Sequence, residues 1–221
     1  MLDCGMDLTG KISRIALDHL VERYASDTKT LEVGAYGSPS YGRFFNNKIG
    51  IDVRPGPGVD QVASVYELPF ESESFDVVLC LSVLEHLETP QKAIEEMKRV
   101  LKPGGRIIVS VPFLFPIHDA PGDYWRFTKF GLRNLFKHNW NIVELRAETT
   151  TQETFAVLFQ RVGYQTQLRW NRFSKGIIFL VARILSKLPT LTVKVFGDIK
   201  KSTLEPEAFA SAFFLVAEKL S

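Results

Sequence analysis

The feature that most constrains this chain is a short apolar run that ends in a glycine-containing turn. Leu31 and Val33 flank an acid, and Gly34 and Gly37 follow directly. Glycine permits positive φ angles and close backbone approaches that a side chain would block. A buried strand that ends in such a turn leaves backbone N–H groups beside a cleft, where a nucleotide-like ligand can bind. The same unit also serves plain packing, so the turn alone leaves both interpretations open.

Apolar runs and helical patterns alternate along the rest of the chain. Strands are predicted at 31–33, 49–53, 61–64, 75–80, 106–111, 141–145 and 212–217. Helices are predicted at 11–24, from Pro90 to a Lys102–Gly105 turn, at 128–136, at 153–162 and at 175–188. Such alternation predicts an α/β fold, doubly wound around a parallel sheet with helices on both faces.

Length and cysteine content fit a single soluble domain. The chain has 221 residues, a net charge of +2 and two cysteines, Cys4 and Cys80. These two cysteines cannot form a disulfide framework or a zinc-binding spacing. A reducing compartment is the default, and because no signal-peptide pattern opens the sequence we predict a cytoplasmic protein.

Positive charge gathers in the C-terminal part of the chain. Between 161 and 201, Asp198 is opposed by Arg161, Arg169, Arg172, Lys175, Arg183, Lys187, Lys194, Lys200 and Lys201. This asymmetry indicates an anionic substrate or surface, or else a solvated basic face. The basic and apolar pattern at 175–188 fits a packed helix, and also a helix in peripheral contact with a membrane. No nucleic-acid partner is expected, and the oligomeric state is left open.

A second acid ends the next predicted strand. Asp52 follows Ile49–Ile51 and lies about 20 residues after Glu32. In nucleoside-binding α/β folds, a carboxylate at this point can accept hydrogen bonds from both ribose hydroxyls. The alternative is an aspartate that only caps its loop.

A series of short motifs follows in order along the chain: Leu31-Glu32-Val33-Gly34, Asp52, Leu68-Pro69-Phe70, Ser74-Phe75-Asp76-Val77-Val78, Leu84-Glu85-His86 and Leu101-Lys102-Pro103-Gly104-Gly105. This ordered series resembles the class I S-adenosylmethionine-dependent methyltransferases. The resemblance implies a Rossmann-like, mostly parallel seven-stranded sheet whose last strand is antiparallel. In a single domain over 1–221, we place an N-terminal helix at 9–25 and the cofactor-binding core at 30–148. A helical insertion or substrate lid then occupies 149–207, before the last strand at 208–221.

The resemblance also implies that S-adenosylmethionine binds across the strand ends and leaves as S-adenosylhomocysteine. The residues implied to contact it are Glu32, Gly34, Ala35, Tyr36, Gly37, Asp52, Val53, Ser64, Val65, Tyr66, Leu81 and Ser82. Two departures stand out: Tyr36 replaces a glycine that is usual in the turn, and Ser64 replaces an acid. They leave open a catalytically weak module that only binds the cofactor. An NAD-type oxidoreductase is the other alternative, but the Gly34-x-x-Gly37 spacing followed by Pro39 does not match its usual turn.

The segment after the strand at 106–111 resembles one found in a type 11-like bacterial subgroup of these enzymes. His118-Asp119-Ala120-Pro121-Gly122-Asp123-Tyr124-Trp125-Arg126-Phe127-Thr128 matches its His-Asp-x-Pro-x-Asp-Tyr-Trp-Arg-Phe-Thr pattern. The subgroup is linked with glycan or other surface-polymer assembly. The resemblance therefore implies methyl transfer to an oxygen or nitrogen of a small-molecule, glycan-like or lipid-linked acceptor.

Within this segment we predict His118 as the catalytic base, oriented by Asp119 or Asp123, because imidazole titrates near neutral pH. The predicted substrate wall consists of Tyr124, Trp125 and Arg126. Alternatively, these polar side chains only hold the loop together. His86 is predicted to be structural. Methyl transfer requires no catalytic metal, and a metal site formed by His118 and the two aspartates has no support from their spacing.

Overall fold

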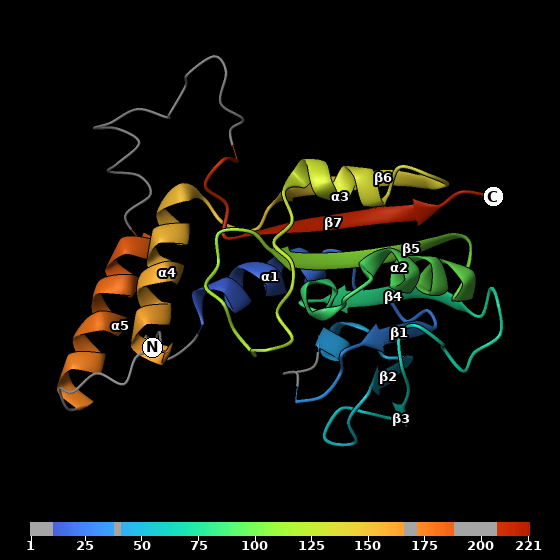
Figure 1. The fold of residues 1–221 in the computed structure, drawn as a ribbon, viewed down its shortest axis with the longest axis horizontal. Coiled ribbons are helices and arrows are strands. Elements are labelled where there is room, and N and C mark those ends of the chain that lie inside the picture. Colours follow the sequence, from blue (N-terminus) through green and yellow to red (C-terminus); the bar gives the residue numbers. More distant parts are fainter. Residues whose placement is uncertain (1–10, 38–40, 166–171, 188–206) are drawn as a thin grey trace, which may run out of the picture.

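A seven-stranded sheet forms the centre of the computed structural model, which describes residues 11–37, 41–165, 172–187 and 207–221 (Figure 1). The strands are β1 (Thr30–Val33), β2 (Lys48–Asp52), β3 (Gln61–Val62), β4 (Phe75–Leu81), β5 (Leu101–Pro112), β6 (Trp140–Ala147) and β7 (Ala212–Lys219). Their order across the sheet is β3-β2-β1-β4-β5-β7-β6. β7 runs antiparallel to both of its neighbours, whereas the other described pairs are parallel. The predicted Rossmann-like sheet with an antiparallel last strand is therefore confirmed.

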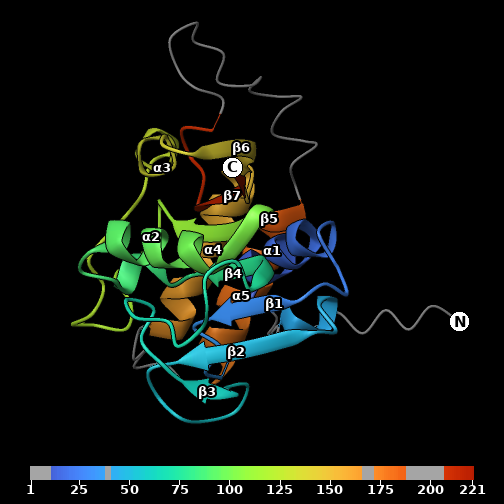
Figure 2. The ribbon, with the colours of Figure 1, turned by 90° about the vertical axis from the view of Figure 1, so that its right-hand side faces the viewer.

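Helices cover both faces of this sheet (Figure 2). On one face lie α1 (Ile12–Glu22) and the short 3₁₀ helix η1 (Tyr41–Phe44), and on the other α2 (Pro90–Val100) and α3 (Lys129–Leu135). Alternate β4 residues face the two layers, because side chains alternate along a strand. Val77 and Leu79 pack with the α1 layer, whereas Val78 and Cys80 pack with the α2 layer.

The junction of α2 and β5 differs from its prediction. A loop was expected at Lys102–Gly105, but β5 begins at Leu101, directly after the helix. Phe75 pairs with Leu101 while Val77 pairs with Arg106, so the irregular register absorbs the extra residues. Gly104, with a φ of 75°, supplies the conformation that this bulge needs.

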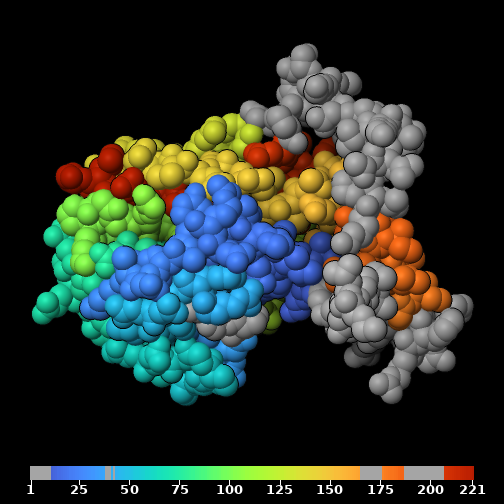
Figure 3. Space-filling model, turned by 180° about the vertical axis from the view of Figure 1, so that it is seen from behind, coloured from blue at the N-terminus to red at the C-terminus, as the bar shows by residue number. Residues whose placement is uncertain are grey.

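Two helices of the predicted insertion stand beyond one end of the sheet (Figure 1). They are α4 (Thr151–Gln165) and α5 (Arg172–Lys187), which pack against each other. The backbone N–H of Ile12 at the start of α1 donates to Gln160 Oε1 at 3.1 Å, which ties α4 to the core. In the view from behind, the blue atoms of the N-terminal part, which includes α1, cover the middle of this face, and the orange atoms of α5 lie to one side (Figure 3).

Much of the expected 149–207 insertion, namely 166–171 and 188–206, lies outside the described residues. Its role as a substrate lid stays a prediction. Within the described part of the chain, no helix is long and apolar enough to cross a membrane. Ala182 packs with Ile12, whereas Ile177 and Leu180 are about half exposed, so α5 is only partly covered by described residues.

The central position of β4 gives a test of the fold. Leu79 is fully buried, and we expect Leu79→Ala to lower the free energy of unfolding by about 2–5 kcal/mol, because it leaves a cavity in the core. Leu220→Ala, at a residue that is 48% exposed, is the matched control and should change it by less than about 0.5 kcal/mol. Urea denaturation measures both. Equal losses for the two variants would contradict the burial of β4.

Candidate active site

Two adjoining cavities open at the carboxyl ends of β1, β2, β4 and β5. The larger has a volume of about 1000 Å³ and lies over the turns after β1 and β2. The smaller, about 420 Å³, lies between the ends of β4 and β5, α1 and α4. The walls common to both are formed by Lys11, Arg14, Ser82, His86 and Asp119.

The glycine turn after β1 forms one wall of the larger cavity. Gly34 and Gly37 carry its positive φ angles, 78° and 61°, so Tyr36 needs no unusual backbone conformation. A Cβ atom on Gly34 would lie 2.4 Å from Val83 Cγ2, which explains why glycine is needed there. Tyr36 lies under the guanidinium of Arg54, 4.4 Å from ring centroid to Cζ, and the pair borders the cavity. Tyr36 is thus accommodated as part of the cavity wall.

Asp52 projects into the larger cavity from the end of β2. Its Oδ1 accepts the backbone N–H of Arg54 at 2.9 Å, and its Oδ2 accepts that of Tyr36 at 3.4 Å. These bonds fix the direction of the carboxylate and leave lone pairs for a ligand, because each oxygen can accept two hydrogen bonds.

Most of the residues predicted to contact a cofactor line this larger cavity. They are Gly34, Tyr36, Gly37, Asp52, Val53, Val65, Leu81 and Ser82. The remaining four, which are not part of its lining, are Glu32, Ala35, Ser64 and Tyr66.

Each of these four residues makes contacts within the protein. Glu32 is buried and pairs with Lys48 Nζ at 2.7 Å, because β1 and β2 lie side by side. Ala35 is buried. Ser64 Oγ accepts the backbone N–H of Tyr66, whose own hydroxyl accepts the backbone N–H of Thr89.

Two residues shared by both cavities have strained backbones. Ser82 and Asp119 have φ angles of 58° and 52°, a region that residues other than glycine seldom occupy. Ser82 is held by its N–H bond to the carbonyl of Ser110 at 2.9 Å. Strain of this kind concentrates at functional sites, so it supports the junction of the cavities as the candidate site.

Arg126 holds the loop after β5 in place. Its guanidinium donates to both carboxylate oxygens of Asp123, at 2.6 and 2.7 Å, and to the carbonyls of Phe115 and Pro116 at 3.0 Å. These hydrogen bonds hold the pKa of the Asp123 carboxyl well below its usual range. Asp123 in turn accepts the backbone N–H of His118 at 2.8 Å.

The predicted substrate wall is not part of either cavity. Arg126 uses its donors within the loop, and Tyr124 and Trp125 are exposed to 49% and 43%. The Trp125 ring donates its N–H to the carbonyl of Leu87 at 2.8 Å. For these three residues, the geometry agrees with the alternative interpretation that they stabilise the loop.

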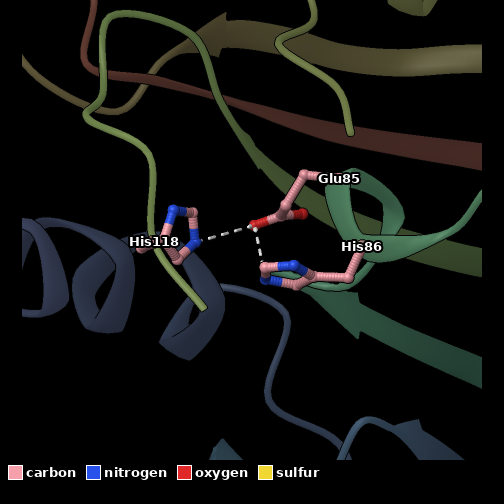
Figure 4. Close-up of side chains that lie close together, drawn as sticks. All are labelled: Glu85, His86 and His118. Carbon is pink, nitrogen blue, oxygen red and sulfur yellow. Dashed lines mark ion pairs between the residues drawn. The ribbon is translucent and has the colours of Figure 1, made fainter. Parts of the chain in front are cut away.

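His118 and Asp119 both line the smaller cavity, whereas Asp123 lies behind His118. Burial lowers the pKa of His118. Its Nε2 faces Glu85, from the 3₁₀ helix η2 (Leu84–His86) that follows β4, at 4.0 Å from Oε1 (Figure 4). His86 Nε2 lies at the same distance from that oxygen.

Glu85 is the functional candidate that sequence reasoning missed. The residue is 1% exposed, and burial raises its pKa to about 8. The sequence does contain a signal that could have identified Glu85 as a functional candidate, namely a glutamate next to a histidine shortly after a buried strand. In the sequence, the Leu84–His86 motif indicates only the family resemblance and a structural histidine.

Three cations also face the smaller cavity and were not predicted there: Lys11, Arg14 and Arg161. The Arg161 guanidinium lies 4.3 Å above the Phe115 ring. Burial and neighbouring positive charges lower the pKa values of Lys11 and Arg161. No ion pair joins any of these three to another described residue, although the charge of Asp119 acts on Lys11 and Arg161. The cavity therefore has cations that can pair with an anionic ligand.

Glu148 supplies a pH-dependent test of this cavity. Its carboxylate accepts the Ser110 hydroxyl, and burial raises its pKa from 4.5 to about 7. The folded state therefore holds this proton more tightly than the unfolded chain, so the free energy of unfolding should fall as pH rises from about 4.5 to 7. Glu148→Gln should remove this part of the pH dependence in urea titrations.

The matched control is Glu71→Gln, which removes an exposed carboxylate and should leave the pH profile parallel to that of the wild type. A Glu148→Gln profile that also runs parallel to the wild type would contradict the burial of this carboxyl group.

Comparisons with known proteins agree with this architecture. Residues 43–109 match the family model described as a methyltransferase domain. The chain is 38% identical over 99 residues to the uncharacterized protein MJ1123 of Methanocaldococcus jannaschii, covering 41% of this chain and 48% of that protein. It is 32% identical over 123 residues to a demethylmenaquinone methyltransferase of Lactiplantibacillus plantarum, covering 49% of this chain and 48% of that protein. The chain thus spans about half the length of these curated relatives.

Among solved structures, the fold is similar to that of a Burkholderia thailandensis 1,6-didemethyltoxoflavin-N1-methyltransferase with its substrate and S-adenosylhomocysteine bound. The TM-score is 0.53 at 16% identity, over 98% of this chain and 80% of that one. Similarity at this identity shows the shared fold, and the reaction has to be argued from the site.

Proposed function

We propose that this chain is a class I S-adenosylmethionine-dependent methyltransferase that transfers a methyl group to a small acceptor. Its fold and the methyltransferase domain matched at residues 43–109 support this proposal. The larger cavity binds the cofactor, and the smaller one binds the acceptor. One observation carries this proposal: the two cavities share a wall at the carboxyl edge of the sheet. Methyl transfer needs donor and acceptor held in contact, which two adjoining cavities provide.

The residues of the larger cavity fit an adenosine-containing ligand. The oriented carboxylate of Asp52 can accept hydrogen bonds from a ribose diol. Val53 is 67% exposed, so its apolar side chain is available to cover an adenine ring. The glycine turn at Gly34 lets the ligand approach the backbone closely. Lys11 and Arg14, at the border between the cavities, are placed to meet the carboxylate of the cofactor's methionine part.

When bound, S-adenosylmethionine would supply a methyl group attached to a positively charged sulfur. The methyl carbon would form a bond to an oxygen or nitrogen of the acceptor, and the bond from this carbon to sulfur would break with its electron pair remaining on sulfur. The acceptor atom would lose one proton. The protein aligns the two ligands and excludes water. The acceptor's proton leaves on the side of the smaller cavity that is lined by Glu85, His86 and His118, because carboxylate and imidazole groups can accept it.

Arg161 points to an anionic acceptor. It lines the smaller cavity and not the larger one, so its charge is directed to the acceptor. With Lys11 and Arg14 nearby, a carboxylate or phosphate on the acceptor would relieve the repulsion among the three cations. A volume of about 420 Å³ accommodates a small molecule, or the reacting end of a glycan- or lipid-linked one.

Binding of the demethylated cofactor tests the first part of the proposal. Calorimetry with S-adenosylhomocysteine should show one site per chain. Asp52→Asn should weaken binding by about 10- to 100-fold, because a charged hydrogen-bond acceptor is lost. Asp27→Asn, an exposed aspartate away from both cavities, should bind as the wild type does. Absence of binding to the wild type, or equal binding by both variants, would refute the cofactor site.

Transfer from isotope-labelled S-adenosylmethionine tests the acceptor class. We expect small hydroxy acids and phenolic acids to be methylated in preference to their uncharged methyl esters. Arg161→Met should lower kcat/KM for the acids by about 10- to 100-fold and leave that for the esters nearly unchanged. Arg133→Met, which removes an exposed arginine of α3, is the control. If acids and esters lose activity alike, Arg161 does not select the charge.

A further inference from the structure

A buried carboxylate without a hydrogen-bond partner lies between two histidine rings at the smaller cavity (Figure 4). Glu85 is 1% exposed, and neither carboxylate oxygen makes a hydrogen bond with any described residue. Nearly all buried polar groups in folded proteins are hydrogen-bonded, because a polar group that leaves water without gaining a partner is destabilising whether it is charged or neutral. A ligand bound next to Glu85 would supply the partner that its buried carboxyl group lacks.

The ring nitrogens of His86 are already assigned by their contacts. Nδ1 lies 2.6 Å from the carbonyl oxygen of Gly122, and because a carbonyl only accepts, Nδ1 carries the proton. Nε2 then presents a lone pair, 4.0 Å from Glu85 Oε1.

His118 is arranged in the same way. Its Nδ1 lies 3.3 Å from the carbonyl of Pro116 and 3.4 Å from Asp123 Oδ2, two groups that only accept. Nη2 of Arg126, 3.4 Å away, already donates to Pro116 and Asp123, so its hydrogens are used. The proton of His118 is on Nδ1, and Nε2 turns its lone pair toward Glu85, 4.0 Å from Oε1.

These distances are too long for hydrogen bonds but suit a shared ion. A distance of 4.0 Å lies beyond hydrogen-bond range, so the histidines do not satisfy Glu85. Two ligand atoms that each bind one tetrahedral ion at about 2.1 Å are about 3.4 Å apart. The three candidate ligand atoms lie within 4.8 Å of one another, so each pair needs to close by up to about 1.4 Å around an ion, which side-chain rotation can supply.

We propose that Glu85, His86 and His118 bind one divalent first-row transition-metal ion, with an open coordination position toward the smaller cavity. Two imidazoles and one carboxylate suit zinc, manganese or iron better than magnesium or calcium, which prefer oxygen ligands only. The carbonyls of Gly122 and Pro116 supply the outer hydrogen bonds that orient metal-binding histidines. This departs from the expectation, drawn from the sequence, that no metal is used.

The ion's effect on the reaction rests on the proposed function. A divalent ion at the wall of the acceptor cavity lowers the pKa of a hydroxyl group bound next to it. It would thereby favour loss of the acceptor's proton, a role that the sequence assigned to His118 as a base. Nε2 of His118 would then be a metal ligand.

Zinc titration of the full chain, without a histidine tag and stripped with chelator, tests the site. We expect one zinc ion per chain by calorimetry and by elemental analysis after dialysis. Glu85→Gln and His118→Gln should each weaken binding by more than about 100-fold, because loss of an outer partner alone costs about 10- to 100-fold. Zinc should raise the unfolding temperature of the wild type and not of these variants.

The chain offers a matched control, since it has four histidines and two of them, His19 and His138, are exposed. The double variant His19→Gln, His138→Gln should bind zinc as the wild type does. Cobalt should give visible absorption bands typical of imidazole ligands in the wild type and the double variant, and lose them in His118→Gln. Zinc binding that is absent from the wild type, or that survives in both Glu85→Gln and His118→Gln, would overturn the proposal.

Zinc binding and cofactor binding are measured separately, so the two proposals fail separately. Loss of S-adenosylhomocysteine binding in Asp52→Asn, with zinc binding intact, tests the cavity for the cofactor alone. If the wild type binds S-adenosylhomocysteine but no zinc, the metal site is refuted and the proposed function stands.

Discussion

Parallel pairing of β1, β4 and β5 determines where the functional groups of this protein meet. Val33 at the end of β1 pairs with Cys80, which in turn pairs with Val109. The three strands therefore end at one edge of the sheet, and the segments that follow them enclose both cavities. Because side chains alternate between the two buried faces of the central strands, a shift by one residue would move each side chain to the opposite helix layer. The register of the core thus fixes the geometry of the site.

Local patterns in the sequence were sufficient to predict the sheet and most of the residues that line the larger cavity. The apolar run of β4 and the glycine turn after β1 depend on neighbouring residues, which a sequence displays directly. The partner of a long charged side chain depends on three-dimensional packing. From the sequence, a phosphate group of a substrate and the carboxylate of Asp123 are equally good partners for Arg126. Only the folded loop shows that Arg126 pairs with Asp123. Glu32 likewise meets Lys48 because two strands lie side by side.

The acceptor side was harder to predict for a related reason. The helical pattern around Arg161 predicted α4 correctly, but not which of its faces meets the core. That depends on how α4 docks against α1 through contacts such as that of Gln160 with Ile12. Glu85 was missed because its burial follows from the loops around it: the backbone N–H groups of Tyr124 and Trp125 both donate to its carbonyl, at 2.9 and 3.2 Å. These bonds join two loops that are distant in sequence.

Because α4 docks against α1 and lies outside the sheet, the proposed acceptor site can change in evolution independently of the proposed cofactor site. The cofactor side is built from strands and turns of the sheet, where a substitution disturbs the core. Arg161 comes from a helix outside the sheet, which touches the body mainly through the start of α1. Replacements on that helix would therefore alter the proposed acceptor site and leave the proposed cofactor site unchanged. Related chains could acquire different acceptors in this way by changes in the α4–α5 pair alone.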